Sequence, residues 1–412
     1  MTNLTFFAEN LYTALHRQDG NLKRLLFSLY GFAFFNKFLL LTPVYAIFMQ
    51  QNGLSDFQLS SMFIISSLAT VFGQVPIAFI TNHVGQRWAM IFGQFLKSVA
   101  VLLWLVFPTY PGFVFGMILW GIQAGFRNVA FEGLVYDSVS ANGDIADYPR
   151  ILGRKSTYES VGVALSALGS LLMFKGYDWV TWASVASILL SVVCLLFVRY
   201  TPPEKIRPKK VRFTKILQSG FRVCLKTPCL LSVMLLALLV VNIPYLDDFL
   251  SPLGLQLGLP TEYVGILSFF LLGCATLGQR FAYRFTHLPD WFLYLLAGIV
   301  GILYVLFSFF YNLDALWLMG IAYILFYGVY TLLYAKLQNM IPLGHRSVVL
   351  SLYTTLMYLV YVIVCGIIGL GGQIGSWAIS IFVLGVLMIA LCAWALLWVR
   401  PRCALPAVDK DD

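Results

Sequence analysis

Charged side chains interrupt apolar stretches that are long enough to cross a lipid bilayer, among them Lys37, Arg127, Glu132, Asp247 and Asp248. A charge at the centre of a membrane helix costs about 2.5–3.5 kcal/mol on insertion scales, so such residues usually have a function. Buried cations can bind a carboxylate or a phosphate, and buried acids can hold a proton. These residue types indicate movement of a polar solute across a membrane.

Two cations with neighbouring amides form the first candidate site. Lys37 lies about 12 residues into the first apolar stretch, roughly 18 Å deep and near the bilayer midplane. Arg127 lies in the fourth stretch, and its guanidinium fork fits a carboxylate or a phosphate. Asn36 precedes the lysine and Gln123 lies one turn before the arginine, so we expect the four to bind an anionic substrate. The alternative is that each cation pairs structurally with another helix.

Glu132 lies about two turns from the predicted cytosolic end of the fourth stretch. Burial would let its carboxyl hold a proton near neutral pH, which suits proton coupling. The same position suits a cytosolic gate, through a salt bridge to Arg87, Arg154 or Lys155. The sequence leaves both roles open.

Asp247 and Asp248 follow Asn242, Pro244 and Tyr245 in the seventh apolar stretch. The proline predicts a kink before the two acids, which lie toward the outer end of the span. We expect a proton site or an outer gate at the acids, and substrate contacts from Asn242 and Tyr245. The alternative is a pair of surface acids solvated by water.

Tyrosines recur on one face of the tenth stretch, at Tyr323, Tyr327, Tyr330 and Tyr334. Their spacing of 4, 3 and 4 residues predicts either helix packing or an aromatic cavity wall, in which the first three contact substrate. In the third stretch, Lys97 is expected to extend along the helix to the nearby inner interface, as long lysine side chains do.

The composition supports an all-α integral membrane protein. The 412 residues are 60% hydrophobic and 11% charged, against about 45–50% and 25% in a soluble domain. Mean hydropathy is +0.84, and the apolar runs have the length of membrane helices rather than of barrel strands. The net charge of +9 fits basic cytosolic loops better than nucleic-acid binding.

Twelve transmembrane helices are predicted, at residues 25–49, 57–81, 88–107, 111–135, 156–174, 178–199, 229–250, 262–283, 291–310, 313–335, 347–370 and 376–399. With both termini in the cytosol, the outer side contains only Lys175 among Lys and Arg residues, which fixes the orientation. The expected organisation is a cytosolic lead-in (1–24), a six-helix bundle (25–199), a basic cytosolic linker (200–228), a second six-helix bundle (229–399) and a cytosolic tail (400–412).

The two predicted bundles share sequence features at one constant offset. Gly53-Leu54 and Gly258-Leu259 are 205 residues apart (258 − 53), and so are Gly73-Gln74 and Gly278-Gln279 (278 − 73). Corresponding spans therefore carry the same dipeptides, which indicates a duplicated six-helix unit. The offset pairs Asn242 with Lys37 (242 − 37 = 205), so only the first half has a cation at this position.

Two stretches resemble the major facilitator superfamily. Ala78 to Arg87 resembles the signature G-x-L-x-D-R-x-G-R-K, in which Gly85 and Arg87 fit and Asn82 replaces the usual Asp. The segments Gly125-Phe126-Arg127, Glu132 to Ser138 and Ile151-Leu152-Gly153-Arg154 resemble a pattern of bacterial members. The resemblance implies two pseudo-symmetric six-helix bundles and a cytosolic gate that includes Asn82, Gly85, Arg87, Asp137 and Arg154.

The resemblance and the buried charges together predict a secondary active transporter that works by alternating access. Lys37 and Arg127 predict a small organic anion as substrate, such as a carboxylate metabolite or a siderophore-like chelate. The fifth span has Gly162 and Gly169 but lacks the proline of the family's antiporter signature, which favours proton-coupled symport. Efflux of drugs or other amphipathic compounds is the alternative.

The remaining expectations concern partners and location. No nucleotide-binding, hydrolase or metalloprotease motif occurs, so we expect neither an ATPase nor another enzyme, and no cofactor or metal. The expected partners are the solute, protons and the lipid bilayer, with no nucleic acid. We expect a monomer that spans the bacterial cytoplasmic (inner) membrane many times.

Overall fold

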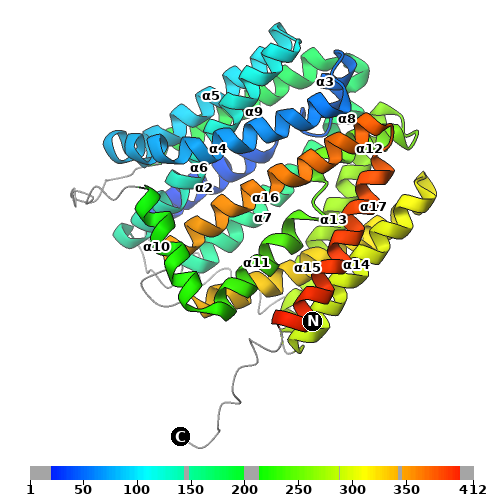
Figure 1. The fold of residues 1–412 in the computed structure, drawn as a ribbon. Helices are drawn as coiled ribbons and strands as arrows, with labels where there is room; N and C mark the ends of the chain where they lie inside the picture. Colours follow the sequence, from blue (N-terminus) through cyan, green and yellow to red (C-terminus); the bar gives the residue numbers. More distant parts are fainter. Residues whose placement is uncertain (1–19, 143–147, 199–212, 287, 342–345, 400–412) are drawn as a thin grey trace, which may run out of the picture. The chain divides into compact units, whose positions relative to one another are not determined.

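The computed structural model describes residues 20–142, 148–198, 213–286, 288–341 and 346–399 (Figure 1). Within these ranges every regular element is helical, as a bilayer demands of a segment that must satisfy its own backbone hydrogen bonds. Nine segments of the described chain are long and apolar enough to span a membrane. The all-α membrane fold is confirmed, while the number of twelve spans stays a prediction.

Contacts between Cα atoms divide the chain into two units. Unit 1 comprises residues 1–42 and 72–209, and unit 2 comprises residues 43–71 and 210–412. Helix α4 (Asp56–Val84) contributes to both units. The two predicted bundles, 25–199 and 229–399, are each continuous in sequence, whereas each unit combines two separate parts of the chain. The bundle boundaries stay a prediction.

Unit 1 contains α2 (Gly20–Lys37), the second part of α4, α5 (Gln86–Val106), α6 (Tyr110–Asn142), α7 (Tyr148–Ser166), α8 (Leu168–Leu171), η2 (Met173–Lys175) and α9 (Tyr177–Leu196). Helix α5 packs along α6, and α2 packs against α7 and α9. Buried aromatic and aliphatic side chains such as Phe32, Phe126 and Phe131 fill the core between these helices.

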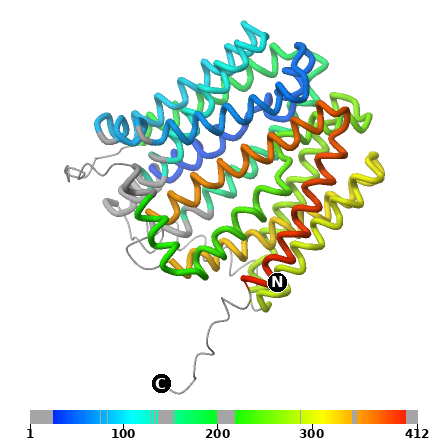
Figure 2. Tube along the Cα trace, viewed as in Figure 1, coloured from blue at the N-terminus to red at the C-terminus, as the bar shows by residue number. Residues whose placement is uncertain are grey.

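Unit 2 contains α3 (Tyr45–Gln51), the first part of α4, α10 (Phe213–Lys226), α11 (Pro228–Asn242), η3 (Asp247–Phe249), α12 (Leu250–Gln256), η4 (Thr261–Tyr263), α13 (Val264–Ala282), η5 (Tyr283–Phe285), α14 (Asp290–Phe310), η6 (Leu313–Ala315), α15 (Leu316–Met340), α16 (Arg346–Ile374), α17 (Trp377–Trp394) and η7 (Ala395–Val399). Helix α17 runs beside α14, and α13 packs on α15 (Figure 2). A Cβ added to Gly301 of α14 would lie 2.6 Å from the Gly385 carbonyl of α17, so glycine permits this close packing.

Two of the predicted spans are each interrupted by a break in the helix. The first span breaks between the end of α2 at Lys37 and the start of α3 at Tyr45. The seventh span breaks between the end of α11 at Asn242 and the start of α12 at Leu250. The kink expected near Pro244 is a full interruption of the helix, and the break in the first span was not predicted.

The segments after these breaks have the same backbone at the predicted offset. Helices α3 and α12 begin 205 residues apart (250 − 45) and end 205 residues apart (256 − 51). The glycine after each helix has a positive φ, 91° at Gly53 and 89° at Gly258, a conformation in which a residue with a side chain would be strained. The Gly53 amide donates to Gln50 O and the Gly258 amide donates to Leu255 O, both at 2.9 Å. The repeated turn supports the inferred duplication.

The fifth predicted span is also discontinuous, because α7 ends at Ser166 and is followed by the short α8 and η2. Two glycines bring this segment directly against the end of α2. A Cβ on Gly162 would lie 2.7 Å from Phe34 O, and one on Gly169 would lie 1.8 Å from Leu40 O. Both glycines therefore allow backbone-to-backbone packing at the first break.

Candidate functional site

A small cavity in unit 1 brings together charges from α2, α6 and α7. Its volume is about 160 Å³. The lining residues share a polar or aromatic character and are Phe32, Lys37, Arg127, Asn128, Phe131, Lys155 and Glu159. We call this cavity the cationic pocket, because three of its side chains are cations and one is an acid. The two cations that the sequence singled out, Lys37 and Arg127, share it.

Lys155 forms an ion pair with the acid of the pocket, Glu159. Lys155 Nζ lies 3.0 Å from Glu159 Oε2, one turn along α7, and 5.1 Å from the centre of the Phe131 ring. Arg127 Nη2 donates a long hydrogen bond of 3.4 Å to Asn128 Oδ1. With three cations and one acid, the lining has a positive character that suits an anionic group.

The broken end of α2 fixes the backbone of Lys37. A helix end leaves carbonyls without intrahelical donors, which is costly inside a membrane. The last four carbonyls of α2 all find donors: Phe34 O from the Phe38 amide at 2.8 Å, Phe35 O from Ser187 Oγ at 3.0 Å, Asn36 O from Lys97 Nζ at 2.6 Å and Lys37 O from Ser166 Oγ at 3.0 Å. Side chains of α5, α7 and α9 thus hold the chain where Lys37 enters the pocket.

The prediction that Lys97 extends to the inner interface is wrong. Its side chain is only 4% exposed, and Nζ donates to Asn36 O at 2.6 Å and to Asn36 Oδ1 at 2.9 Å. Nζ also lies 5.2 Å from the centre of the Trp120 ring. Within the described ranges it makes no ion pair. The negative end of the α2 dipole and the freed carbonyl attract the ammonium to this depth.

The two predicted amide ligands lie behind the cationic pocket and do not line it. Asn36 is 1% exposed, and its Oδ1 accepts the Lys97 bond. Gln123 is likewise buried, and its Nε2 has no hydrogen-bond partner among the described residues. Asn36 therefore serves to hold Lys97, while direct lining contacts of the pocket come from residues such as Asn128 and Phe131, which sequence reasoning did not select.

In unit 2, Asp247 lies at the second break and is held by the tyrosine face of α15. It accepts hydrogen bonds from Tyr323 Oη at 3.0 Å and from Tyr327 Oη at 2.8 Å. The two rings are 5.9 Å apart. The sequence predicted both this acid and this tyrosine face, but it did not pair them.

Asp248 is held in the same manner by tyrosines of α3 and α16. It accepts hydrogen bonds from Tyr45 Oη at 3.2 Å and from Tyr361 Oη. Tyr245 packs edge-on against Tyr361, with ring centres 5.3 Å apart. Neither Tyr45 nor Tyr361 was predicted, because each is remote in sequence from the acid that it contacts.

We call the two aspartates with Tyr45, Tyr323, Tyr327 and Tyr361 the acid–tyrosine cluster. Both carboxyls are partly buried, and each accepts two phenol hydrogen bonds. These contacts favour a built site over the alternative of two acids solvated only by water.

The other predicted contacts of unit 2 lie outside this cluster. Asn242 is buried, and its Nδ2 donates to Leu238 O of its own helix at 2.8 Å. Tyr330 stacks on Tyr334 with ring centres 5.7 Å apart. Tyr304, which was not predicted, donates to Pro244 O at 2.6 Å and satisfies a carbonyl of the second break.

The predicted gate is only partly described. Gly85 separates α4 from α5 with a φ of 91°. Arg87 Nη2 donates to Leu196 O at 2.7 Å, and Arg154 is partly buried in α7. The side chains of Asn82, Glu132 and Asp137 lie outside the described residues, so the gate and the role of Glu132 stay predictions.

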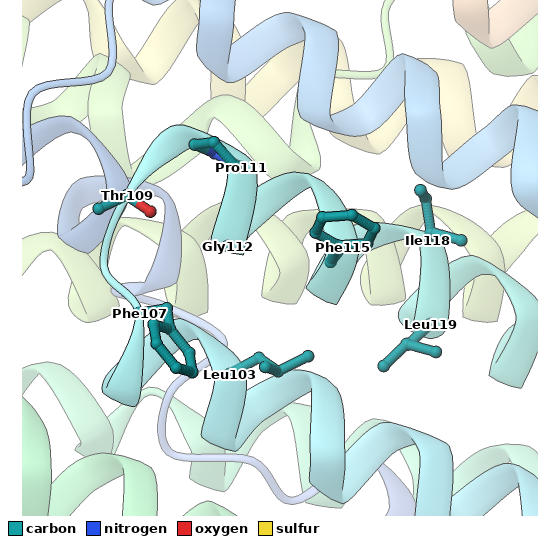
Figure 3. Close-up of a pocket in the computed structure, with 8 residues that line it drawn as sticks. All are labelled: Leu103, Phe107, Thr109, Pro111, Gly112, Phe115, Ile118 and Leu119. Carbon is teal, nitrogen blue, oxygen red and sulfur yellow. The ribbon is translucent and has the colours of Figure 1, made fainter.

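A second cavity in unit 1, of about 470 Å³, lies at the turn between α5 and α6 (Figure 3). Its eight lining residues include Leu103, Phe107 and Phe115, with the Thr109 hydroxyl as the polar side chain. This surface suits lipid chains and offers nothing to orient a charged solute. Across the described residues, no group of three His, Cys, Asp or Glu side chains is placed to hold a metal ion.

Comparisons with known proteins identify the family and the fold. The Major Facilitator Superfamily profile matches residues 26–364. Three solved structures are similar to this chain. The POT family transporter PepTSo has a TM-score of 0.71 and 12% identity, and the match covers 93% of this chain and 98% of that chain. A D-xylose-proton symporter has a TM-score of 0.68 and 13% identity, covering 91% of this chain and 97% of that chain. A bacterial homolog to the human lysosomal transporter Spinster has a TM-score of 0.68 and 15% identity, covering 93% of this chain and 97% of that chain. At these identities the structures show a common fold. No curated protein sequence matches the chain.

Proposed function

The chain belongs to the major facilitator superfamily, and from this premise we propose that it is a proton-coupled secondary transporter of a small organic anion. As a member with nine apolar segments in its described part, it is a multi-pass membrane transporter. We further propose that it works as a monomeric symporter in the bacterial cytoplasmic membrane, with both termini in the cytosol.

The observation that carries this proposal is that Lys37 and Arg127 share the cationic pocket. Two cations on separate helices, beside the already paired Lys155, favour a ligand with a carboxylate or phosphate group. A volume of about 160 Å³ is smaller than the roughly 300–1,000 Å³ of pockets that enclose a drug-sized ligand. The pocket therefore suits the anionic group of a metabolite or chelate, and the rest of that solute would lie outside it.

Proton coupling is supported by the acid–tyrosine cluster. Each of the two carboxyls accepts phenol hydrogen bonds, so loss or gain of a proton at an aspartate would rearrange contacts to α15 or α16. Such a group can couple protonation to movement of the helices that it bridges. One structure with this fold is named as a D-xylose-proton symporter, which supports the feasibility of proton coupling in this architecture.

The test is a ligand-binding screen of the purified full chain. Carboxylate metabolites, iron chelates and cationic dyes are compared by thermal shift for the wild type, Lys37→Ala, Arg127→Ala and the control Lys175→Ala, whose cation is exposed in η2. A ligand of the folded state raises the unfolding temperature. Losing a charge-assisted hydrogen bond of about 1.5–3 kcal/mol should weaken anion binding about 10- to 150-fold in the two pocket variants. Equal anion-induced shifts in all four proteins would refute the anion site.

Efflux of amphipathic cations is the second candidate, and the acid–tyrosine cluster is the observation that favours it. Two carboxyls surrounded by phenol rings could bind an organic cation through charge and cation–π contacts. In the same screen, this function predicts shifts from cationic dyes that survive Arg127→Ala and disappear in Asp247→Asn. Shifts from anions alone would exclude it.

A further inference from the structure

Helix α10, which lies within the basic linker (200–228) and directly precedes α11, has one face fixed against the protein. A Cβ added to Gly220 would lie 3.0 Å from Val348 O and 3.3 Å from Leu352 Cβ, both on α16. One turn later, Cys224 is fully buried, with Sγ 3.8 Å from Met234 Sδ of α11. The lack of a side chain at Gly220 lets α10 approach α16 closely, so the rotation of the helix is defined.

The neighbouring face of α10, about 100° around the helix from Gly220 and Cys224, exposes two large apolar side chains. Phe221 is 49% exposed and Leu225 is 53% exposed. They are one turn apart and therefore form one apolar ridge. Such a ridge is unfavourable in water, and a lipid interface removes that cost.

Two cations run beside this ridge. At about 100° per residue, Arg222 and Lys226 lie next to Leu225 around the helix, on the side away from Gly220 and Cys224. Both are exposed, and neither makes an ion pair with a residue in the described ranges. The free face is thus half apolar and half cationic.

The position of α10 and the sequence around it determine what such a face meets. The helix ends at Lys226, and the apolar span Pro228–Gln256 begins two residues later, so α10 lies beside the bilayer boundary. Residues 200–228 contain eight Lys or Arg residues and one acid, Glu204. Clusters of four to eight basic residues next to a span are typical of contacts with anionic lipid headgroups.

We propose that the free face of α10 binds anionic phospholipids, with Phe221 and Leu225 among the acyl chains and Arg222 and Lys226 at the headgroups. The phosphate charge complements the two cations, and the acyl chains solvate the apolar ridge. This site is separate from the cationic pocket, and the proposal does not depend on the solute. Because α10 packs on α16, which carries Tyr361 of the acid–tyrosine cluster, lipid occupancy acts on the same helix as the proposed proton site.

The test measures lipid retention by the full chain. Purified protein is equilibrated in detergent with equal amounts of phosphatidylglycerol and phosphatidylcholine, then repurified, and the bound lipids are quantified by mass spectrometry. The wild type should retain more phosphatidylglycerol than phosphatidylcholine. The double variant Arg222→Gln/Lys226→Gln should lose at least about half of that excess, and 0.5 M salt should reduce it in the wild type by screening.

The matched control is Arg280→Gln/Arg284→Gln, which removes two exposed cations at the end of α13 and in η5. This control should keep the wild-type excess. Equal retention by the α10 variant and the wild type, or an equal loss in the control, would overturn the proposal. The variant Phe221→Ser/Leu225→Ser tests the apolar ridge, and it should lose both lipids; unchanged retention would show that the ridge does not bind acyl chains. Unfolding temperatures near that of wild type confirm folding, and none of these measurements uses transport.

Discussion

The breaks between α2 and α3 and between α11 and α12 lie at corresponding positions of the 205-residue repeat and carry opposite charges. Lys37 ends α2, and the neutral Asn242 ends α11 at the corresponding position (242 − 37 = 205). Five residues after Asn242, Asp247 stands where the first half has Thr42 (247 − 42 = 205). The duplicated scaffold thus supplies an interrupted helix twice, and a few substitutions make one break cationic and the other acidic.

The two breaks are also held by different chemistry. At the first break, the free backbone carbonyls of α2 accept hydrogen bonds from the Lys97 ammonium of α5 and from the hydroxyls of Ser166 in α7 and Ser187 in α9. The second is held by phenols, with Tyr304 on the Pro244 carbonyl and Tyr327 on Asp247. The position that corresponds to Lys97 is Ile302 (302 − 97 = 205), which is 49% exposed. Lys97 is therefore specific to the first break.

The largest expected effect on stability comes from Lys97→Met. Methionine keeps most of the volume but leaves Asn36 O and Oδ1 buried without their donor, which should lower the free energy of unfolding by about 1.5–3 kcal/mol. Thermal unfolding in detergent measures this loss. The matched control is Ile302→Met, at the corresponding exposed position, which should change stability by less than about 0.5 kcal/mol. If the two substitutions had equal effects, Lys97 would not hold the first break.

The next effect in size tests the backbone contact between the fifth span and the first break. In Gly169→Ala, the new methyl group would lie 1.8 Å from Leu40 O, and we expect a loss of about 1–3 kcal/mol from overpacking. The control Gly366→Ala, which introduces a methyl with no heavy atom within 4 Å, should not destabilise the protein. Chemical denaturation of both variants measures the difference, and a tolerated Gly169→Ala would argue against tight packing at this point.

A smaller effect is expected at the second break from Tyr327→Phe. This change removes one of the two phenol bonds to Asp247 and leaves the bond from Tyr323, so stability should fall by about 0.5–1.5 kcal/mol. Tyr263→Phe, at an exposed tyrosine of η4, should have no effect. Thermal unfolding again provides the measurement, and a full loss of folding would mean that the phenols do more than support the acid.

Much of this architecture could be predicted from the sequence because the bilayer leaves few choices. Long apolar runs must form helices, and the 205-residue offset is visible in two dipeptides. The charges at Lys37, Arg127 and Asp247 could be found because each is costly in an apolar stretch. All of these signals can be read from the sequence without knowledge of tertiary contacts.

The features that the sequence did not predict depend on tertiary contacts. No glycine or proline precedes Pro43 in the first break, so nothing local shows that α2 stops at Lys37. The position of Lys97 follows from the carbonyl freed by that break, and snorkelling was the reasonable expectation without it. Tyr45 and Tyr361 contact Asp248 from 203 and 113 residues away, and no helical spacing encodes such a contact.

The most direct test of the account is to measure, with a ligand found in the anion screen, the dissociation constant of the wild type, Lys37→Gln and Asp247→Asn. If the first break binds the anion and the second handles the proton, Lys37→Gln should raise the dissociation constant at least about tenfold, because a charge-assisted contact is lost. Asp247→Asn should leave it within about twofold of the wild type. A result in which Asp247→Asn weakens anion binding tenfold while Lys37→Gln leaves it unchanged would contradict the division of roles between the two breaks.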